Sequence, residues 1–170
     1  MRLQINRRVT VNAPASKTWR VIAHEFGEIE RWSSGIKVSR GTSEDTAPEG
    51  APIAGRHCDA IQERFTHFDE QAMEFGYEMV DPPWFVRNIG NSWRVHSLEP
   101  DKSIIEMRPE IECHLILGLF IAPLLKLFGR IVVDRTFAEV AYYIENDQPH
   151  PRKQKQMERA RQHTSVPQNH

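Results

Sequence analysis

The feature that most constrains this chain is a change of hydrophobic periodicity near residue 116. Before that point, apolar residues alternate with polar ones, which is typical of half-buried strands. Beyond it, residues recur at three- and four-residue steps, as on one face of a helix. This pattern predicts a helix that runs to about Asn146, is roughly 36 to 45 Å long and is either kinked or started by Pro123. The recurring residues are Leu117, Ile121, Leu124, Phe128, Ile131, Arg135, Ala138 and Tyr142.

The segments before this helix predict a sheet with short helices inserted early. Residues 2–11 alternate as a strand, Pro14 favours a helix that ends at Gly27, and Glu28–Trp32 favours a second short helical turn. Further strands are predicted at residues 36–40, 56–59, 61–67, 72–80, 86–98 and 103–113. Segments 56–59 and 61–67 are either two tightly joined strands or one long bent strand. We therefore expect an α+β fold, in which a curved antiparallel sheet of about seven strands wraps around the long C-terminal helix. The gap inside such a sheet is a natural ligand cavity.

Composition excludes several classes of protein. The 170 residues are 39% hydrophobic and 26% charged, which is typical of a globular domain. The net charge of −1 disfavours a dedicated nucleic-acid binder. Residues 1–8 lack the apolar stretch of a secretory signal, and the apolar run 115–125 is too short to span a bilayer. We expect a cytoplasmic protein with no transmembrane segment.

The C-terminal residues have a different character. From His150 to His170 there are five basic residues and one acidic residue, Glu158, so this segment carries a charge of +4. It contains few apolar side chains, which predicts disorder or a frayed helix. The expected organisation is a domain over residues 1–146 and a basic tail over 147–170. Such a tail can contact nucleic acid or anionic lipid, or can be a solvated segment with no specific use.

Signatures of metal sites and covalent catalysis are absent from the sequence. The eight histidines are scattered without metal-ligand spacing, and Cys58 and Cys113 are too few for a disulfide framework. No nucleophile elbow occurs. The glycines of segment 50–55 have phosphate-loop spacing, but Arg56 and His57 stand where a lysine and a hydroxyl residue are required. We predict no metal and no cofactor, and the pattern assigns no catalytic residue.

Three local motifs resemble those of a known superfamily. The first is Val11-Asn-Ala-Pro14 leading to Trp19-Arg-Val-Ile22, then Phe26-Gly27-x-Ile29 and Trp32. The second is Gly55-Arg56-x-Cys58 with Glu63-Arg64 and Phe68-Asp69-Glu70, and the third is Tyr77 with a later Ser92-Trp93 strand. In this order they are similar to the START and birch-pollen-allergen (SRPBCC) superfamily, in its polyketide cyclase/dehydrase branch, over residues 2–146. The resemblance implies a helix-grip fold with a hydrophobic ligand cavity, and leaves activity open because members include carriers, receptors and cyclases.

Strand parity identifies candidate ligand contacts. Tyr77, Asn91 and Trp93 fall on apolar strand faces, where they are equally compatible with core packing and ligand contact. Arg56, Glu63 and His96 are the candidate acid/base groups, although Arg56 and Glu63 also fit an exterior ion pair. Arg135 either faces inward as an anchor or reaches the surface beside Asp134 or Glu139. The predicted ligand-binding residues are Trp32, Arg56, Glu63, Tyr77, Asn91, Trp93, Met107 and Arg135.

Three functions remain open at this point. The first is binding or transport of a small hydrophobic, lipid-like or polycyclic ligand by a monomer or homodimer. The second is a cyclase/dehydrase-type enzyme acting on a polyketide-like substrate. The third is an interaction protein that exposes Leu117, Phe120 and Ile121. The binder is preferred over the enzyme because no convincing acid/base pair stands out.

Overall fold

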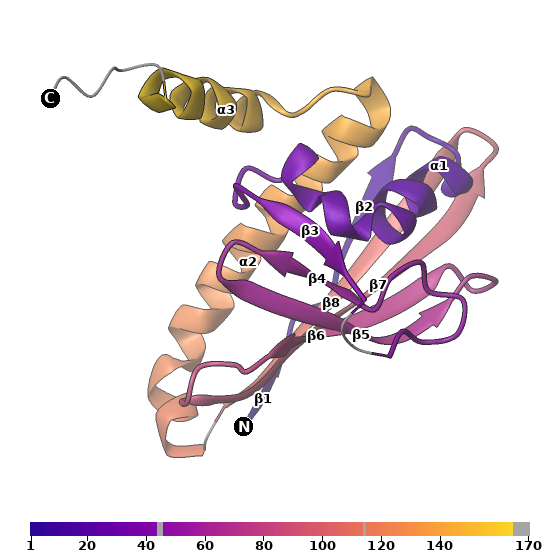
Figure 1. Cartoon of the computed structure of the whole chain (residues 1–170). Helices are drawn as coiled ribbons and strands as arrows, with labels where there is room; N and C mark the ends of the chain where they lie inside the picture. The colour runs from indigo at the N-terminus through magenta and orange to yellow at the C-terminus, as the bar shows by residue number, and fades with distance from the viewer. Residues whose placement is uncertain (44–45, 114, 165–170) are drawn as a thin grey trace, which may run out of the picture.

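A long helix packs against a strongly curved antiparallel sheet, with short helices near the N-terminus (Figure 1). The computed structural model describes residues 1–43, 46–113 and 115–164, and the side chains of these except 115–126 and 163–164. The helical elements are α1 (Ala15–Trp19), the π-helical η1 (Arg20–His24), the 3-10 helix η2 (Phe26–Arg31), α2 (Leu115–Asn146) and α3 (Pro151–Thr164). The strands are β1 (Arg2–Gln4), β2 (Arg7–Val11), β3 (Ser39–Thr42), β4 (Gly55–Cys58), β5 (Ile61–Asp69), β6 (Glu74–Val80), β7 (Val86–Glu99) and β8 (Lys102–Cys113).

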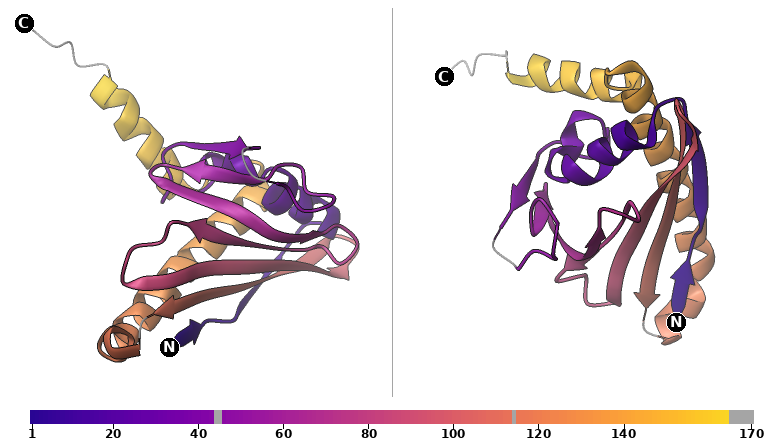
Figure 2. Two further views of the ribbon diagram at one scale, coloured as in Figure 1. Left: turned by 60° about the horizontal axis from the view of Figure 1, so that its bottom comes forward. Right: turned by 90° about the vertical axis from the view of Figure 1, so that its right-hand side faces the viewer.

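The sheet has eight strands in the order β1-β8-β7-β6-β5-β4-β3, and β2 also pairs with β8. All of these neighbouring strands pair in antiparallel fashion, and from β3 to β8 the neighbours are also consecutive in the chain. The predicted first strand, 2–11, is divided into β1 and β2, which occupy successive stretches of the same β8 edge. Figure 2 shows the resulting curvature, with β3 and β2 on opposite sides of the fold.

The two alternatives for residues 56–67 are resolved as two strands. Asp59 has a left-handed backbone (φ 51°) in the tight turn between β4 and β5. Its carboxylate accepts hydrogen bonds from the backbone N–H groups of Lys37 (3.2 Å) and Val38 (3.0 Å). These bonds hold residues 37–38 outside the ladder, so β3 begins at Ser39 rather than at the predicted residue 36.

The predicted helix and its length agree with α2, but the predicted buried stripe is wrong in the described half. Phe128 and Ile131 are more than half exposed, whereas the inward side chains are Val133, Phe137, Val140 and Ile144. Their spacing of four, three and four residues is also helical. The segment carries apolar residues on more than one face, so periodicity alone selects the wrong face.

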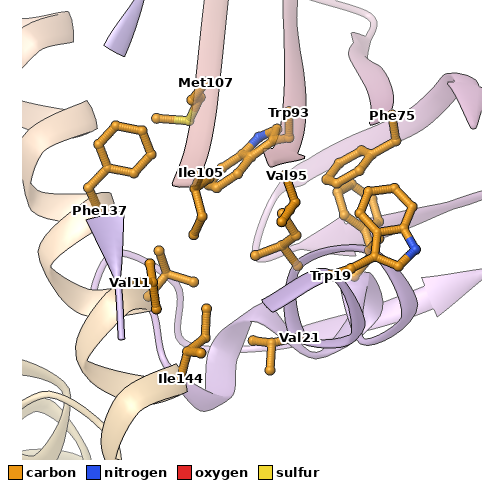
Figure 3. Packing of buried hydrophobic residues seen from close by; sticks show 14 of the residues in the cluster. Val11, Trp19, Val21, Phe75, Trp93, Val95, Ile105, Met107, Phe137 and Ile144 are labelled. Carbon is orange, nitrogen blue, oxygen red and sulfur yellow. The ribbon is translucent and has the colours of Figure 1, made fainter. Parts of the chain in front are cut away.

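One continuous core joins the sheet, the short helices and α2. Trp93 and Met107 project from β7 and β8 toward Phe137 of α2, while Trp19 and Phe75 pack at the other side (Figure 3). The ring centroids of Trp93 and Phe137 are 6.2 Å apart in an edge-to-face arrangement. This contact fixes α2 against the concave face and defines one side of the space described below.

The C-terminal residues form more structure than a disordered tail. After Asp147, which has a left-handed backbone (φ 53°), residues Pro151–Thr164 form α3. Pro151 suits the first turn of a helix because its missing N–H is not needed there. The Lys153 ammonium donates to the Ile36 carbonyl oxygen at 2.7 Å, which ties α3 to the segment between η2 and β3.

Candidate functional site

A cavity of about 390 Å³ lies between α2 and the inner face of the sheet. Its size falls within the range of sites for small organic molecules. Segment 29–36, strands β4 to β8 and the middle of α2 all contribute to its wall. The lining residues are Ile29, Ser33, Gly35, Ile36, Arg56, Cys58, Ile61, Glu63, Tyr77, Asn91, Trp93, Met107, Pro109, Val132, Val133, Arg135, Thr136 and Glu139.

Seven of the eight predicted ligand-binding residues line this cavity. Six of them lie on strands, where alternate residues share one face, and Arg135 lies on α2. Trp32 does not line the cavity: only 5% exposed, it belongs to the hydrophobic core cluster. Trp93 lines the cavity and also packs in the core, where its ring stacks on Phe75 with 6.3 Å between the ring centroids. The seven that line it are Arg56, Glu63, Tyr77, Asn91, Trp93, Met107 and Arg135.

Arg56 and Glu63 form a buried ion pair on the inner face. They are directly opposed in the β4–β5 ladder, and Arg56 Nε lies 2.6 Å from Glu63 Oε2. The two side chains are only 6% and 18% exposed, so the alternative of an ion pair on the exterior of the sheet is wrong. The neighbouring Gly55 permits this close strand approach, since a Cβ there would lie 2.1 Å from the Glu63 carbonyl oxygen.

The Arg56 guanidinium has further partners. It lies 3.7 Å from the ring centroid of Phe26 and 5.2 Å from that of Tyr77, and its Nη1 donates to the Phe26 carbonyl oxygen at 3.0 Å. Burial, the largest single influence, would lower the pKa of Arg56, but the interactions with Glu63, Tyr77 and Cys58 together outweigh it and the pKa is raised. Arg56 therefore remains a fixed cation at one end of the cavity.

Tyr77, Asn91 and Trp93 supply uncharged hydrogen-bonding groups. Asn91 Nδ2 donates to the Tyr77 hydroxyl oxygen at 3.1 Å, which leaves the hydroxyl proton for another acceptor. Burial, reinforced by the charge of Glu63, raises the pKa of Tyr77 to about 12, so the hydroxyl is protonated at neutral pH. Asn91 Oδ1 and Trp93 Nε1 are buried and make no hydrogen bond of normal geometry within the described residues. An acceptor and two donors are thus added to the two ion pairs in the wall of the cavity.

Neither Cys58 nor His96 is suited to chemistry in the cavity. Burial raises the pKa of the Cys58 thiol to about 11, which makes it a poor nucleophile at neutral pH. His96 is not among the cavity residues; its Nε2 lies 3.4 Å from Glu106 Oε2, in a cluster that includes Arg8 and Arg108. His96 is therefore not a base for chemistry in the cavity.

Glu139 is a buried carboxylate in the cavity wall that the sequence suggested only as a neighbour of Arg135. It accepts hydrogen bonds from the Ser34 backbone N–H (2.8 Å), the Ser34 hydroxyl and Arg135 Nε (3.1 Å). Burial would raise the pKa of Glu139, but the bonds from Ser34 and Arg135 outweigh it and the pKa is lowered. The spacing of four residues between Arg135 and Glu139 is the sequence signal for this pair. Asp134 instead lies 3.6 Å from Arg7.

The sequence pattern of the polyketide cyclase/dehydrase and lipid transport family matches residues 2–145. The chain belongs to this family, within the SRPBCC/START-like superfamily, and its helix-grip fold is the one that the resemblance implied. Comparison with curated proteins finds no significant match.

Solved structures share the fold at low sequence identity. A START superfamily protein from Mycobacterium smegmatis aligns with a TM-score of 0.68 at 12% identity, over 84% of this chain and 97% of that one. The Zhui aromatase/cyclase from a Streptomyces species aligns at 0.58 and 13% identity, over 88% and 100%. A norcoclaurine synthase from Thalictrum aligns at 0.62 and 11% identity, over 85% and 94%. At these identities the matches establish the fold alone. Among the described residues, no helix is long and apolar enough to cross a membrane.

Proposed function

We propose that this protein binds and carries one small, largely apolar molecule that bears a carbonyl or hydroxyl group. The observation that carries this proposal is the cavity between α2 and the sheet, where apolar walls surround a small set of hydrogen-bonding groups. Ile29, Ile61 and Met107 provide apolar contact, and the Tyr77 hydroxyl retains a proton to donate. This combination of apolar side chains with a few polar groups in the wall suits recognition of a largely apolar ligand that carries a polar group.

A cyclase or dehydrase is the alternative, favoured by the protonated Tyr77 hydroxyl on a ring whose centroid lies 5.2 Å from the Arg56 guanidinium. Such groups can polarise a substrate carbonyl. General base catalysis also needs a proton acceptor within reach of the substrate. Glu63 and Glu139 line the cavity, but each carboxylate is engaged by an arginine. We therefore prefer the carrier function.

Tyr77→Phe tests the proposed ligand contact. The probe is prodan, a neutral naphthalene ketone whose fluorescence responds to the polarity around it. Loss of the hydroxyl donor should weaken prodan binding about three- to tenfold, the usual worth of one net hydrogen bond. Fluorescence titration gives the dissociation constant, and circular dichroism confirms that the variant is folded.

Tyr142→Phe is the matched control, because Tyr142 packs on His150 and is not among the cavity residues. It should bind prodan like the wild type. Equal affinities in all three proteins, or no prodan binding by the wild type, would contradict the proposed site.

A further inference from the structure

A second hollow lies between α3 and the segment that follows η2. Its volume is about 710 Å³, and we call it the basic groove. The lining residues are Ser34, Lys37, Val38, Arg135, Arg152, Lys153, Lys155, Gln156, Met157, Arg159 and Ala160. Six of these are cationic and none is acidic, so the groove presents one sign of charge.

Arg135 and Arg152 both contact Glu139, at 3.1 and 3.7 Å, but other cations of the groove are unpaired within the part of the chain that the structure describes. Lys37, Lys155 and Arg159 form no ion pair with any described residue. Lys153 is only 3% exposed, and its ammonium donates to a backbone carbonyl oxygen rather than to a carboxylate. Its positive charge therefore lies beneath the groove instead of extending into solvent.

The groove also has apolar surface. Val38 is 65% exposed and Met157 is 40% exposed, and both line it. A site for a free inorganic anion needs no such surface, whereas an anionic group attached to a hydrophobic body would contact both kinds of side chain.

The basic groove adjoins the cavity. Arg135 lines both spaces, and segment 33–38 contributes residues to the wall of each. Along this segment Ser33, Gly35 and Ile36 line the cavity, whereas Ser34, Lys37 and Val38 line the groove.

We propose that the basic groove holds the anionic group of an amphiphile whose apolar body occupies the cavity. The ligand class is then a carboxylate or phosphate carried on a hydrophobic body. This inference rests on the proposed carrier function and adds the charge of its ligand. Residues Pro151–Thr164 lie beyond the segment matched by the family, so the groove is a feature that α3 adds to the shared fold.

The test compares dodecanoate with dodecanol, which differ in charge but share the same chain. Binding to the full chain is measured by displacement of prodan at low salt. The variant Lys155→Gln/Arg159→Gln removes two unpaired cations of the groove. The control Arg130→Gln/Arg161→Gln removes two exposed cations that do not line it, so the change of net charge is matched.

The wild type should bind dodecanoate more tightly than dodecanol. The groove variant should lose about three- to tenfold affinity for dodecanoate, with dodecanol unchanged, and high salt should reduce the difference. The control variant should behave like the wild type. Equal binding of both ligands by all three proteins would overturn the inference while leaving the carrier function intact.

Two further outcomes identify other occupants. Inorganic phosphate that binds as tightly as dodecanoate, with the same dependence on Lys155 and Arg159, would overturn the amphiphile and indicate a free anion. Binding to phosphatidylglycerol vesicles without binding of monomeric dodecanoate would overturn it in favour of membrane docking. Failure of prodan itself to bind would count against the carrier function as well.

Discussion

At the scale of single residues, Arg56 and Glu63 are the most demanding feature of the molecule. Two charges inside a protein lose hydration, and only close pairing and further hydrogen bonds offset that loss. The pair meets this requirement through the Nε to Oε2 contact, the bond to the Phe26 carbonyl oxygen and the aromatic rings beside the guanidinium. It therefore contributes a fixed polar end to the cavity only while both partners are present.

Removing one charge of this pair should be costly. Glu63→Gln leaves the Arg56 cation buried without its counter-ion, so we expect the free energy of unfolding to fall by about 3 to 5 kcal/mol. Urea denaturation followed by tryptophan fluorescence measures the change. The control is Glu78→Gln, which removes the partner of the half-exposed Arg64 and should cost no more than about 1 kcal/mol. A cost for Glu63→Gln as small as that of the control would contradict the buried placement.

At the scale of elements, the outer face of the sheet is organised around one carboxylate. Glu106 of β8 lies opposite Arg8 of β2 in the ladder and accepts hydrogen bonds from Arg8 and Arg108 at 3.0 and 2.7 Å. Burial beneath these side chains would raise the pKa of Glu106, but the bonds from Arg108 and Arg8 outweigh it and the pKa is lowered. The network links β2 to β8.

The lowered pKa gives the stability of the sheet a defined pH dependence. Above the ordinary glutamate pKa of about 4.3 the network contributes fully, and its contribution is lost as pH falls through the lower pKa of the folded state. Glu106→Gln should therefore reduce stability at pH 7 by roughly 1 to 3 kcal/mol. The difference in the free energy of unfolding between this variant and the wild type should become smaller at acidic pH. Urea denaturation at several pH values checks this, with the exposed Glu99→Gln as control; a pH-independent difference would be inconsistent with an ionised Glu106.

Some of these elements could be predicted from the sequence, and others could not. Alternation over residues 86–98 and 103–113 predicts β7 and β8 well, because each strand has one face toward the core. The same parity brings Tyr77, Asn91 and Trp93 to one cavity. The inward face of α2 was not predictable from spacing, since Phe128, Ile131 and Val133 all fit some helical stripe. The ordered α3 depends on Ile36, a tertiary partner that local composition does not reveal.

At the scale of the whole molecule, the site results from a sheet that curves around a helix without filling the space between them. Phe137, Val140 and Ile144 pack one half of α2 into the core, while Val132, Val133 and Thr136 line the cavity. The family to which the chain belongs includes lipid transport and polyketide cyclases. We propose binding rather than turnover for this member because each cavity carboxylate is paired with an arginine, and α3 adds a basic groove beside the cavity.

Native mass spectrometry of the purified full chain, followed by organic extraction, tests the carrier function most directly. We predict one bound small molecule per cavity that is released on denaturation, is recovered chemically unchanged after incubation with fresh protein, and rebinds to the stripped chain. Conversion of the extracted molecule into a product would contradict the carrier function and support the enzyme. A ligand-free chain that also fails to bind prodan would contradict the central claim that the cavity is a binding site.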